Sequence, residues 1–260
     1  MCNESVQQKQ EFKIMRYKEL TFEGRNAVLE AFRSGKTIDK LYILDGCQDG
    51  PVKSIVREAK KTSTIISYVE KERLDRLANT GHHQGVVAIG AAYEYADVED
   101  ILEAARSKGE DPFIFILDEI EDPHNLGAII RTANLAGAHG VIIPKRRAVG
   151  LTATVAKTSA GAINYTPVAK VTNIAATIES LKKEGLWFVC ADMGGETMYN
   201  LNLKGPIGLV IGNEGNGVSR LVKEKCDFVA SIPMKGDIDS LNASVAAGVM
   251  AFEIVRQRSM

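Results

Sequence analysis

The sequence predicts an α/β fold in two parts, of which the second is built on a parallel sheet. In the second half, near-continuous apolar runs alternate with amphipathic stretches, a pattern typical of strands that are covered on both faces. The runs are 113–118, 140–144, 186–192, 207–214 and 228–233. The stretches predict helices at 126–137, 151–160, 173–184, 219–226 and 241–257. Trp187 lies inside an apolar run and is expected in the core.

Residues 16–92 predict a smaller α/β domain. In GRNAVLEAFRS (24–34), Val28, Leu29 and Phe32 are spaced like one face of a helix, and Pro51 favours the start of a second helix. Strands are predicted at 40–44, 64–69 and 85–90. Residues 1–15 are expected to form a flexible tail, and 93–112 an acidic linker with a helical turn or two before the domain at 113–260.

The overall charge conceals an uneven distribution. The 260 residues hold 32 Lys and Arg against 33 Asp and Glu, and 45% of them are hydrophobic. This composition excludes a disordered chain, a coiled coil and a collagen-like repeat. A net charge of −1 argues against a nucleic-acid binder, yet residues 1–92 carry 15 bases and 12 acids. The linker carries two bases and seven acids, so it masks a mildly basic first half.

Four cysteines, Cys2, Cys47, Cys190 and Cys226, include no CxxC pair, so free thiols are expected. The polar first residues lack the apolar stretch of a signal peptide, and no run is long enough to span a membrane. These features indicate a cytoplasmic protein.

Unusual polar residues follow three of the predicted strands, where parallel sheets bind ligands. In the first loop, Asn125 precedes Arg131 by six residues; the structural alternative is a capped surface helix with a solvated arginine. In the third, Ser240 and Asn242 open a helix rich in Ala and Gly, where the alternative is again capping.

The second loop, GNEGNG (212–217), has its glycines in GxxGxG spacing and is followed by no GK[ST]. It therefore matches neither the dinucleotide fingerprint nor the P-loop. Glu214 inside the loop would repel a phosphate, so a ligand that is not an anion is expected there. The structural alternative is a tight turn from strand to helix.

Together, N-x(5)-R, GNEGxG and IPM-x(6)-LN-x-S resemble the SpoU (TrmH) branch of the SPOUT RNA methyltransferases. The strings EGRNAVLEA, HQGVVA, DPHNLGA, VIIPK, LNASVA and EIVRQR are similar to the bacterial 23S ribosomal RNA guanosine-2′-O-methyltransferase group. The resemblance covers about residues 16–258. Val218 departs from it, because a larger Leu or Met is common there.

The resemblance implies a SPOUT α/β domain with a deep trefoil knot at about 207–258, which holds S-adenosylmethionine. It implies an L30e-like RNA-binding domain in the first half, and a homodimer whose active site lies at the interface. The implied catalytic residues are Asn125, Arg131, Glu214, Ser240 and Asn242. The implied cofactor positions are Gly212, Ile232 and Leu241, with Met234 and Ser244 as neighbours. No metal is implied.

Candidate RNA contacts in the first half are Arg25, Asn26, His82, His83 and Gln84. Lys145, Arg146 and Arg147 follow a strand tip and are candidates for phosphate contact, although a short basic run is usually a solvated loop.

The implied reaction is methyl transfer to a ribose 2′-hydroxyl, for which a guanosine of 23S ribosomal RNA is the first candidate. Arginine stays protonated, so Arg131 is expected to stabilise the developing alkoxide, and the proton acceptor is left open between Arg131 and Glu214. Three alternatives stay open: a transfer RNA methyltransferase of the same family, an RNA-binding protein without catalysis, and an unrelated nucleotide-binding α/β protein.

Overall fold

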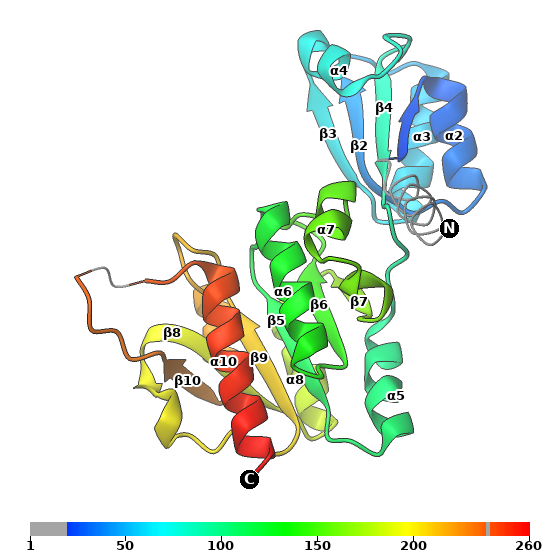
Figure 1. The fold of residues 1–260 in the computed structure, drawn as a ribbon. Coiled ribbons are helices and arrows are strands. Elements are labelled where there is room, and N and C mark those ends of the chain that lie inside the picture. Colours follow the sequence, from blue (N-terminus) through cyan, green and yellow to red (C-terminus); the bar gives the residue numbers. More distant parts are fainter. Residues whose placement is uncertain (1–19, 238–239) are drawn as a thin grey trace, which may run out of the picture. The chain divides into compact units, whose positions relative to one another are not determined.

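The computed structural model describes residues 20–237 and 240–260, which form two compact units. Of the described residues, unit 1 comprises 20–94 and 150–153, and unit 2 comprises 95–149, 154–237 and 240–260. Each unit combines one sheet with packed helices (Figure 1), so the predicted α/β class is confirmed.

Unit 1 has a four-stranded mixed sheet in the order β1-β4-β2-β3. Its elements are β1 (Leu20–Glu23), α2 (Arg25–Arg33), β2 (Ile38–Leu44), α3 (Gly50–Lys61), β3 (Ile65–Val69), α4 (Lys71–Leu77) and β4 (Val86–Gly90). Helices α2 and α3 share a core with Leu41 and Ile43 of β2. Leu74 of α4 packs with Tyr42 and Val87. Along strand β2, Tyr42 lies between Leu41 and Ile43, so its side chain points to the other face of the sheet. Helix α4 therefore covers the opposite face of the sheet from α2 and α3.

Unit 2 has a six-stranded sheet in the order β10-β8-β9-β5-β6-β7, and all of its pairings are parallel. The strands are β5 (Phe113–Leu117), β6 (Gly140–Pro144), β7 (Val168–Val171), β8 (Trp187–Thr197), β9 (Ile207–Ile211) and β10 (Phe228–Ser231). The helices are α5 (Val98–Lys108), α6 (Pro123–Leu135), α7 (Ala153–Thr158), α8 (Ile174–Lys183), α9 (Arg220–Lys225) and α10 (Ala243–Arg258), with short 3-10 helices η1 (Ala162–Asn164) and η2 (Met198–Asn200). The parallel sheet is the predicted one; strands β1 and β7 were not predicted. The trefoil knot stays a prediction.

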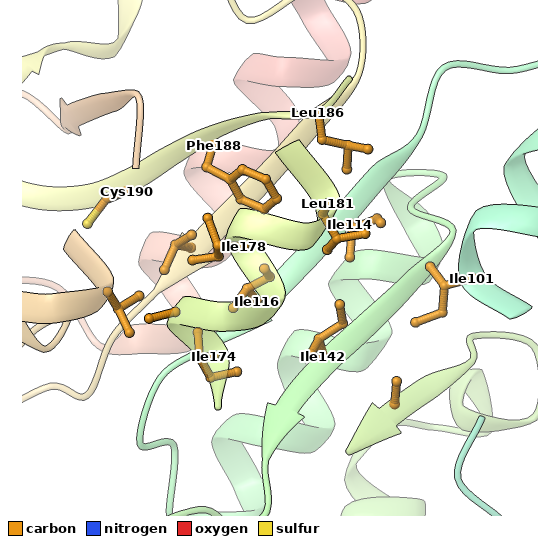
Figure 2. Close-up of a cluster of buried hydrophobic side chains, with 14 of the residues drawn as sticks. Ile101, Ile114, Ile116, Ile142, Ile174, Ile178, Leu181, Leu186, Phe188 and Cys190 are labelled. Carbon is orange, nitrogen blue, oxygen red and sulfur yellow. The ribbon is translucent and has the colours of Figure 1, made fainter. Parts of the chain in front are cut away.

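The core on one face of this sheet is built from aliphatic side chains that α8 brings to the strands. Figure 2 shows Ile178 and Leu181 of α8 close to Ile114 of β5 and Phe188 of β8. All four are at most 2% exposed. Their burial supplies the hydrophobic free energy that holds the strands in register.

The acidic segment 93–112 forms more structure than its composition suggests. Helix α5 is 11 residues long and begins with a capping box. The Asp97 side chain accepts a hydrogen bond from the backbone N–H of Asp100, and the Asp100 side chain accepts one from the backbone N–H of Asp97. Ile101 and Leu102 are buried in the same core as Ile114. The helix is longer than predicted because its apolar stripe packs into the core of unit 2, to which it belongs, while its acids face solvent.

Trp187 is not a core residue, and that prediction is wrong. It is 52% exposed and stacks on Phe228, with ring centroids 5.9 Å apart. Strand β8 lies between β9 and the edge strand β10, so it is next to the edge of the sheet. One end of its apolar run therefore reaches the surface.

Cys47, Cys190 and Cys226 are free thiols, whereas Cys2 and the predicted tail lie outside the described residues. Within 20–237 and 240–260, no helix combines the length and the apolar character needed to cross a membrane.

Changing Ile101 to Ala tests whether α5 belongs to the core of unit 2. Ile101 is fully buried, so the change should lower the free energy of unfolding of unit 2 by about 2–5 kcal/mol in urea titrations. Glu103→Ala, on the exposed side of the same helix, should change it by no more than about 0.5 kcal/mol. Equal midpoints for the two variants would show that α5 is only tethered to the sheet.

Candidate active site

A cavity of about 540 Å³ opens beyond the carboxyl ends of β9 and β10, where parallel sheets bind ligands. Its walls come from β8, from the glycine loop after β9, from the segment after β10 and from the start of α10. The volume is within the ordinary range for small-ligand sites.

The glycine loop is a tight turn that pairs with itself. The backbone groups of Asn213 and Gly217 exchange two hydrogen bonds, of 3.1 and 2.8 Å. A Cβ atom on Gly212 would lie 2.2 Å from the carbonyl carbon of Gly217, so only glycine fits there. The Asn213 side chain accepts from Gly215 N at 2.8 Å and donates to the Glu119 carbonyl at 3.1 Å. The loop thereby holds Glu214 at its tip; sequence reasoning did not identify Asn213.

Three side chains from three distant motifs meet at one carboxylate oxygen. Asn125 Nδ2 donates to Glu214 Oε1 at 2.8 Å, and Asn242 Nδ2 donates both to Glu214 Oε1 and to Asn125 Oδ1, the latter at 3.0 Å. The backbone N–H of Ala243 donates to the same Oε1 at 3.3 Å. We call Asn125, Glu214 and Asn242 the Glu214 network.

The helix ends orient this network. Asn242 Oδ1 accepts from Ser244 N at 3.0 Å and Val245 N at 3.3 Å, so it caps α10 and turns its Nδ2 toward Glu214. Helix α6 is capped by Asp122, which accepts from His124 N at 2.9 Å. Capping therefore does not explain Asn125, which is 8% exposed and directed at Glu214.

The remaining predicted residues divide between the cavity and the surface. Gly212, Ile232, Met234, Ser240 and Leu241 line the cavity. Ser244 lies outside this lining, and its Oγ donates to Asn242 Oδ1 at 2.6 Å. Arg131 is exposed on α6, and its guanidinium forms no hydrogen bond or ion pair with any residue that the structure describes.

Asp192 is a further charged group in the cavity wall that the motifs did not identify. The pairing of β8 with β10 jumps from Cys190 to Glu196, so the residues between them bulge out of the sheet. Asp192 Oδ1 lies 2.9 Å from Lys223 Nζ and accepts from Gly194 N at 3.1 Å. Partial burial opposes ionisation, but these two hydrogen bonds outweigh it and hold the pKa of Asp192 below its usual value. The sequence feature that could have identified Asp192 is its position at the end of a predicted strand, where parallel sheets bind ligands.

The predicted RNA contacts of unit 1 fall into three groups. Arg25 and Gln84 contact each other: Arg25 Nε donates to the Gln84 carbonyl at 3.2 Å, and Arg25 Nη2 lies 2.5 Å from Asp49 Oδ2. His83 is buried, with Nε2 at 2.9 Å from Asp75 Oδ1 and Nδ1 accepting from Gly85 N at 3.0 Å. Asn26 and His82 are exposed.

In the loop after β6, Arg146 and Arg147 are exposed and Lys145 is half-buried. Arg147 Nη1 lies 2.6 Å from Glu119 Oε1, next to the carbonyl that Asn213 contacts. Among the described residues, no group of three His, Cys, Asp or Glu side chains could hold a metal ion.

Comparison with known proteins identifies the family. Residues 112–252 match the model of the SpoU rRNA methylase family. The chain belongs to this family. Residues 22–96 match the model described as RNA 2′-O ribose methyltransferase substrate binding. The resemblance inferred from the three motifs is confirmed at the level of the family.

Relatives and solved structures agree with this assignment. The chain is 52% identical over 91% of its length to a putative TrmH family tRNA/rRNA methyltransferase, YacO, of Bacillus subtilis (strain 168), and covers 95% of it. The crystal structure of the SpoU methyltransferase AviRb from Streptomyces viridochromogenes matches 93% of this chain and 90% of its own, at 27% identity and TM-score 0.60. The same enzyme in complex with AdoMet matches at 24% identity and TM-score 0.58, covering 92% and 90% of the two chains, which shows the fold alone.

Proposed function

We propose that this SpoU family enzyme transfers a methyl group from S-adenosylmethionine to a ribose 2′-hydroxyl of RNA, with a guanosine of 23S ribosomal RNA as the first substrate to test. The observation that carries the proposal is the Glu214 network at the cavity. It combines the three motifs on which the family resemblance was recognised.

The cavity suits the cofactor in size, in backbone access and in charge. Gly212 leaves the backbone open to close approach, and the Glu214 carboxylate favours a ligand with a positively charged sulfur. In this proposal Gly212, Ile232 and Leu241 hold the cofactor through backbone groups, beside Met234. When bound, S-adenosylmethionine supplies a methyl group that its positive sulfur has already activated, so the reaction requires no metal.

The two carboxylate oxygens of Glu214 differ in their hydrogen bonds. Oε1 accepts from Asn125, Asn242 and Ala243, whereas Oε2 accepts no hydrogen bond from the described residues. The network therefore orients the carboxylate and leaves Oε2 to accept from a hydroxyl or ammonium group of a bound reactant. Such orientation of reacting groups can lower the barrier by roughly 7–11 kcal/mol.

Arg131 has the charge to stabilise an alkoxide that develops on the ribose, because a guanidinium keeps its proton at any working pH. Its exposure and its lack of partners among the described residues fit a group that acts on RNA. Ser240, at the cavity wall, is placed to hydrogen-bond the ribose or the cofactor.

We further propose a homodimer formed through α10, with Arg131 of α6 at the interface. Val245 and Phe252 lie seven residues apart on α10 and are 49% and 50% exposed, so they form one apolar stripe with Val249 between them. Helix α6 packs directly beside α10. Exposed apolar stripes of this kind mark interaction surfaces. The three free thiols among the described residues fit a reducing compartment, which we take to be the cytoplasm.

Arg131→Ala tests the catalytic proposal. Loss of the guanidinium should lower the rate of methyl transfer to 23S ribosomal RNA about 10²–10³-fold while S-adenosylmethionine still binds. The measurements are transfer of a radiolabelled methyl group and calorimetry with the cofactor. Mapping of 2′-O-methyl sites in ribosomal and transfer RNA, with the unaltered and the Arg131→Ala gene, identifies the substrate. Undiminished transfer by a variant that binds cofactor normally would remove Arg131 from the mechanism.

Transfer RNA is the second candidate substrate, because the relatives are named tRNA/rRNA methyltransferases. Loss of a methyl group from transfer RNA alone would favour it over ribosomal RNA. Absence of cofactor binding by the unaltered chain would favour an RNA-binding protein without catalysis.

Phe252→Glu tests the homodimer. A charge at the Phe252 end of the apolar stripe should convert the dimer to a monomer in light scattering coupled to size-exclusion chromatography. Leu221→Glu, at an equally exposed apolar position on α9, is the matched control and should remain dimeric. A dimer that survives Phe252→Glu would place the interface elsewhere.

A further inference from the structure

Unit 1 carries a groove between α3 and the edge strand β3, with a volume of about 680 Å³. Val52 and Val56 of α3 contribute its apolar side chains. Its charged and aromatic lining consists of Lys53, Arg57, Lys60, Lys61 and Tyr68, and it includes no acidic side chain. We call this the basic groove. None of these residues belongs to the motifs discussed above.

The cations form a row because of their helical spacing. Lys53, Arg57 and Lys60 lie at i, i+4 and i+7 of α3, which places them on one face over about 10 Å of helix. Glu58 lies 2.9 Å from Lys61 and 3.7 Å from Arg57, and so offsets part of the charge. Lys53 and Lys60 form no ion pair with any residue of the described ranges. The groove therefore keeps a net positive charge that its own unit does not neutralise.

Tyr68 adds an aromatic surface to this charge. It lies on β3, the last strand of the sheet, and is 55% exposed. The side chain of a core tyrosine would be buried by its neighbours, whereas the Tyr68 ring is accessible to a ligand. Phosphate-binding cations beside an open aromatic ring are the combination with which proteins bind single-stranded nucleic acid.

The basic groove continues into the region of the predicted RNA contacts. A second cavity of about 530 Å³ is lined by Arg25, Gln84 and Cys47, and Cys47 also lines the basic groove. Arg25 itself is paired with Asp49 at 2.5 Å. Because that ion pair reduces the charge available at Arg25, Lys53 and Lys60 of α3, which have no ion pair among the described residues, are the stronger phosphate ligands on this surface.

We propose that the basic groove holds the phosphate backbone of the RNA substrate, with Lys53, Arg57 and Lys60 as phosphate contacts and Tyr68 stacked on a base. The proposal rests on the proposed function for the identity of the partner as RNA. It places substrate affinity on α3 and β3 of unit 1, apart from the chemistry of the Glu214 network.

The test is the salt dependence of RNA binding by the full chain. The probes are deproteinised 23S ribosomal RNA and unfractionated transfer RNA. Each lost phosphate contact lowers the slope of log affinity against log salt by about one, so Lys53→Gln/Arg57→Gln/Lys60→Gln should lower it by about three. Lys53→Gln and Lys60→Gln singly should each lower it by about one. These side chains are exposed, and circular dichroism checks that the variants fold.

Matched variants separate this surface from a general loss of charge. Lys71→Gln/Arg73→Gln/Arg76→Gln removes three cations from α4, on the opposite face of the same sheet, and should keep the full slope. Tyr68→Ala should weaken binding roughly 5- to 150-fold with little change in slope, whereas Tyr68→Phe should retain the stacking and the affinity.

An unchanged slope in the α3 triple variant overturns the proposal, as does an equal loss in the α4 control. Failure of the proposed function has a different signature. In that case the unaltered chain would bind RNA with the full slope but would bind no S-adenosylmethionine. The α3 triple variant should bind S-adenosylmethionine like the unaltered chain, because the cofactor cavity lies in unit 2.

Discussion

The carboxylate oxygen Oε1 of Glu214 is the point on which the site depends. It accepts from the side chains of Asn125 and Asn242 and from the backbone of Ala243, residues that stand 89, 28 and 29 positions away in the chain. Hydrogen bonds to an ionised acceptor are stronger than those between neutral groups. One oxygen therefore joins the start of α6, the loop after β9 and the start of α10 beside the cavity, whose lining includes Glu214 and Ala243. Removing any one partner leaves the others with unsatisfied polar groups.

The parallel sheet makes this meeting possible. Strands β5 and β9 are neighbours, with Phe115 paired to Leu209, so the segments that follow them leave the same edge of the sheet. The self-paired turn of Asn213 and Gly217 then fixes where Glu214 lies, and Asp118 at the end of β5 accepts from Ser219 N at 2.8 Å just beyond that turn. The buried isoleucines of the core keep these strand ends in register (Figure 2). Core packing and site geometry are thus two results of the same strand order.

The sequence predicted the parallel sheet, because apolar runs are local signals. It singled out the residues of the Glu214 network only through the family resemblance of the three motifs taken together. It did not predict α5 at full length. The acidic composition indicated a linker, and a short apolar run that includes Ile101 and Leu102 does not by itself show that these side chains are buried in the core. Trp187 was misplaced because hydrophobicity does not reveal which strand lies next to a sheet edge. Asp192 and the basic groove were missed for a related reason. Lys223 comes next to Asp192, and Tyr68 next to the cations of α3, only when the chain is folded.

A double-mutant cycle on Asn125 and Glu214 tests the central claim most directly. The quantity is the free energy of S-adenosylmethionine binding, measured by calorimetry for Asn125→Ala, Glu214→Ala and the double variant. If the two side chains act as one unit, the second change adds little to the first, and the coupling free energy is about 0.5–3 kcal/mol. If the changes in binding free energy of the two single variants add up to that of the double variant within about 0.3–0.5 kcal/mol, the two side chains act independently, which would contradict a shared network.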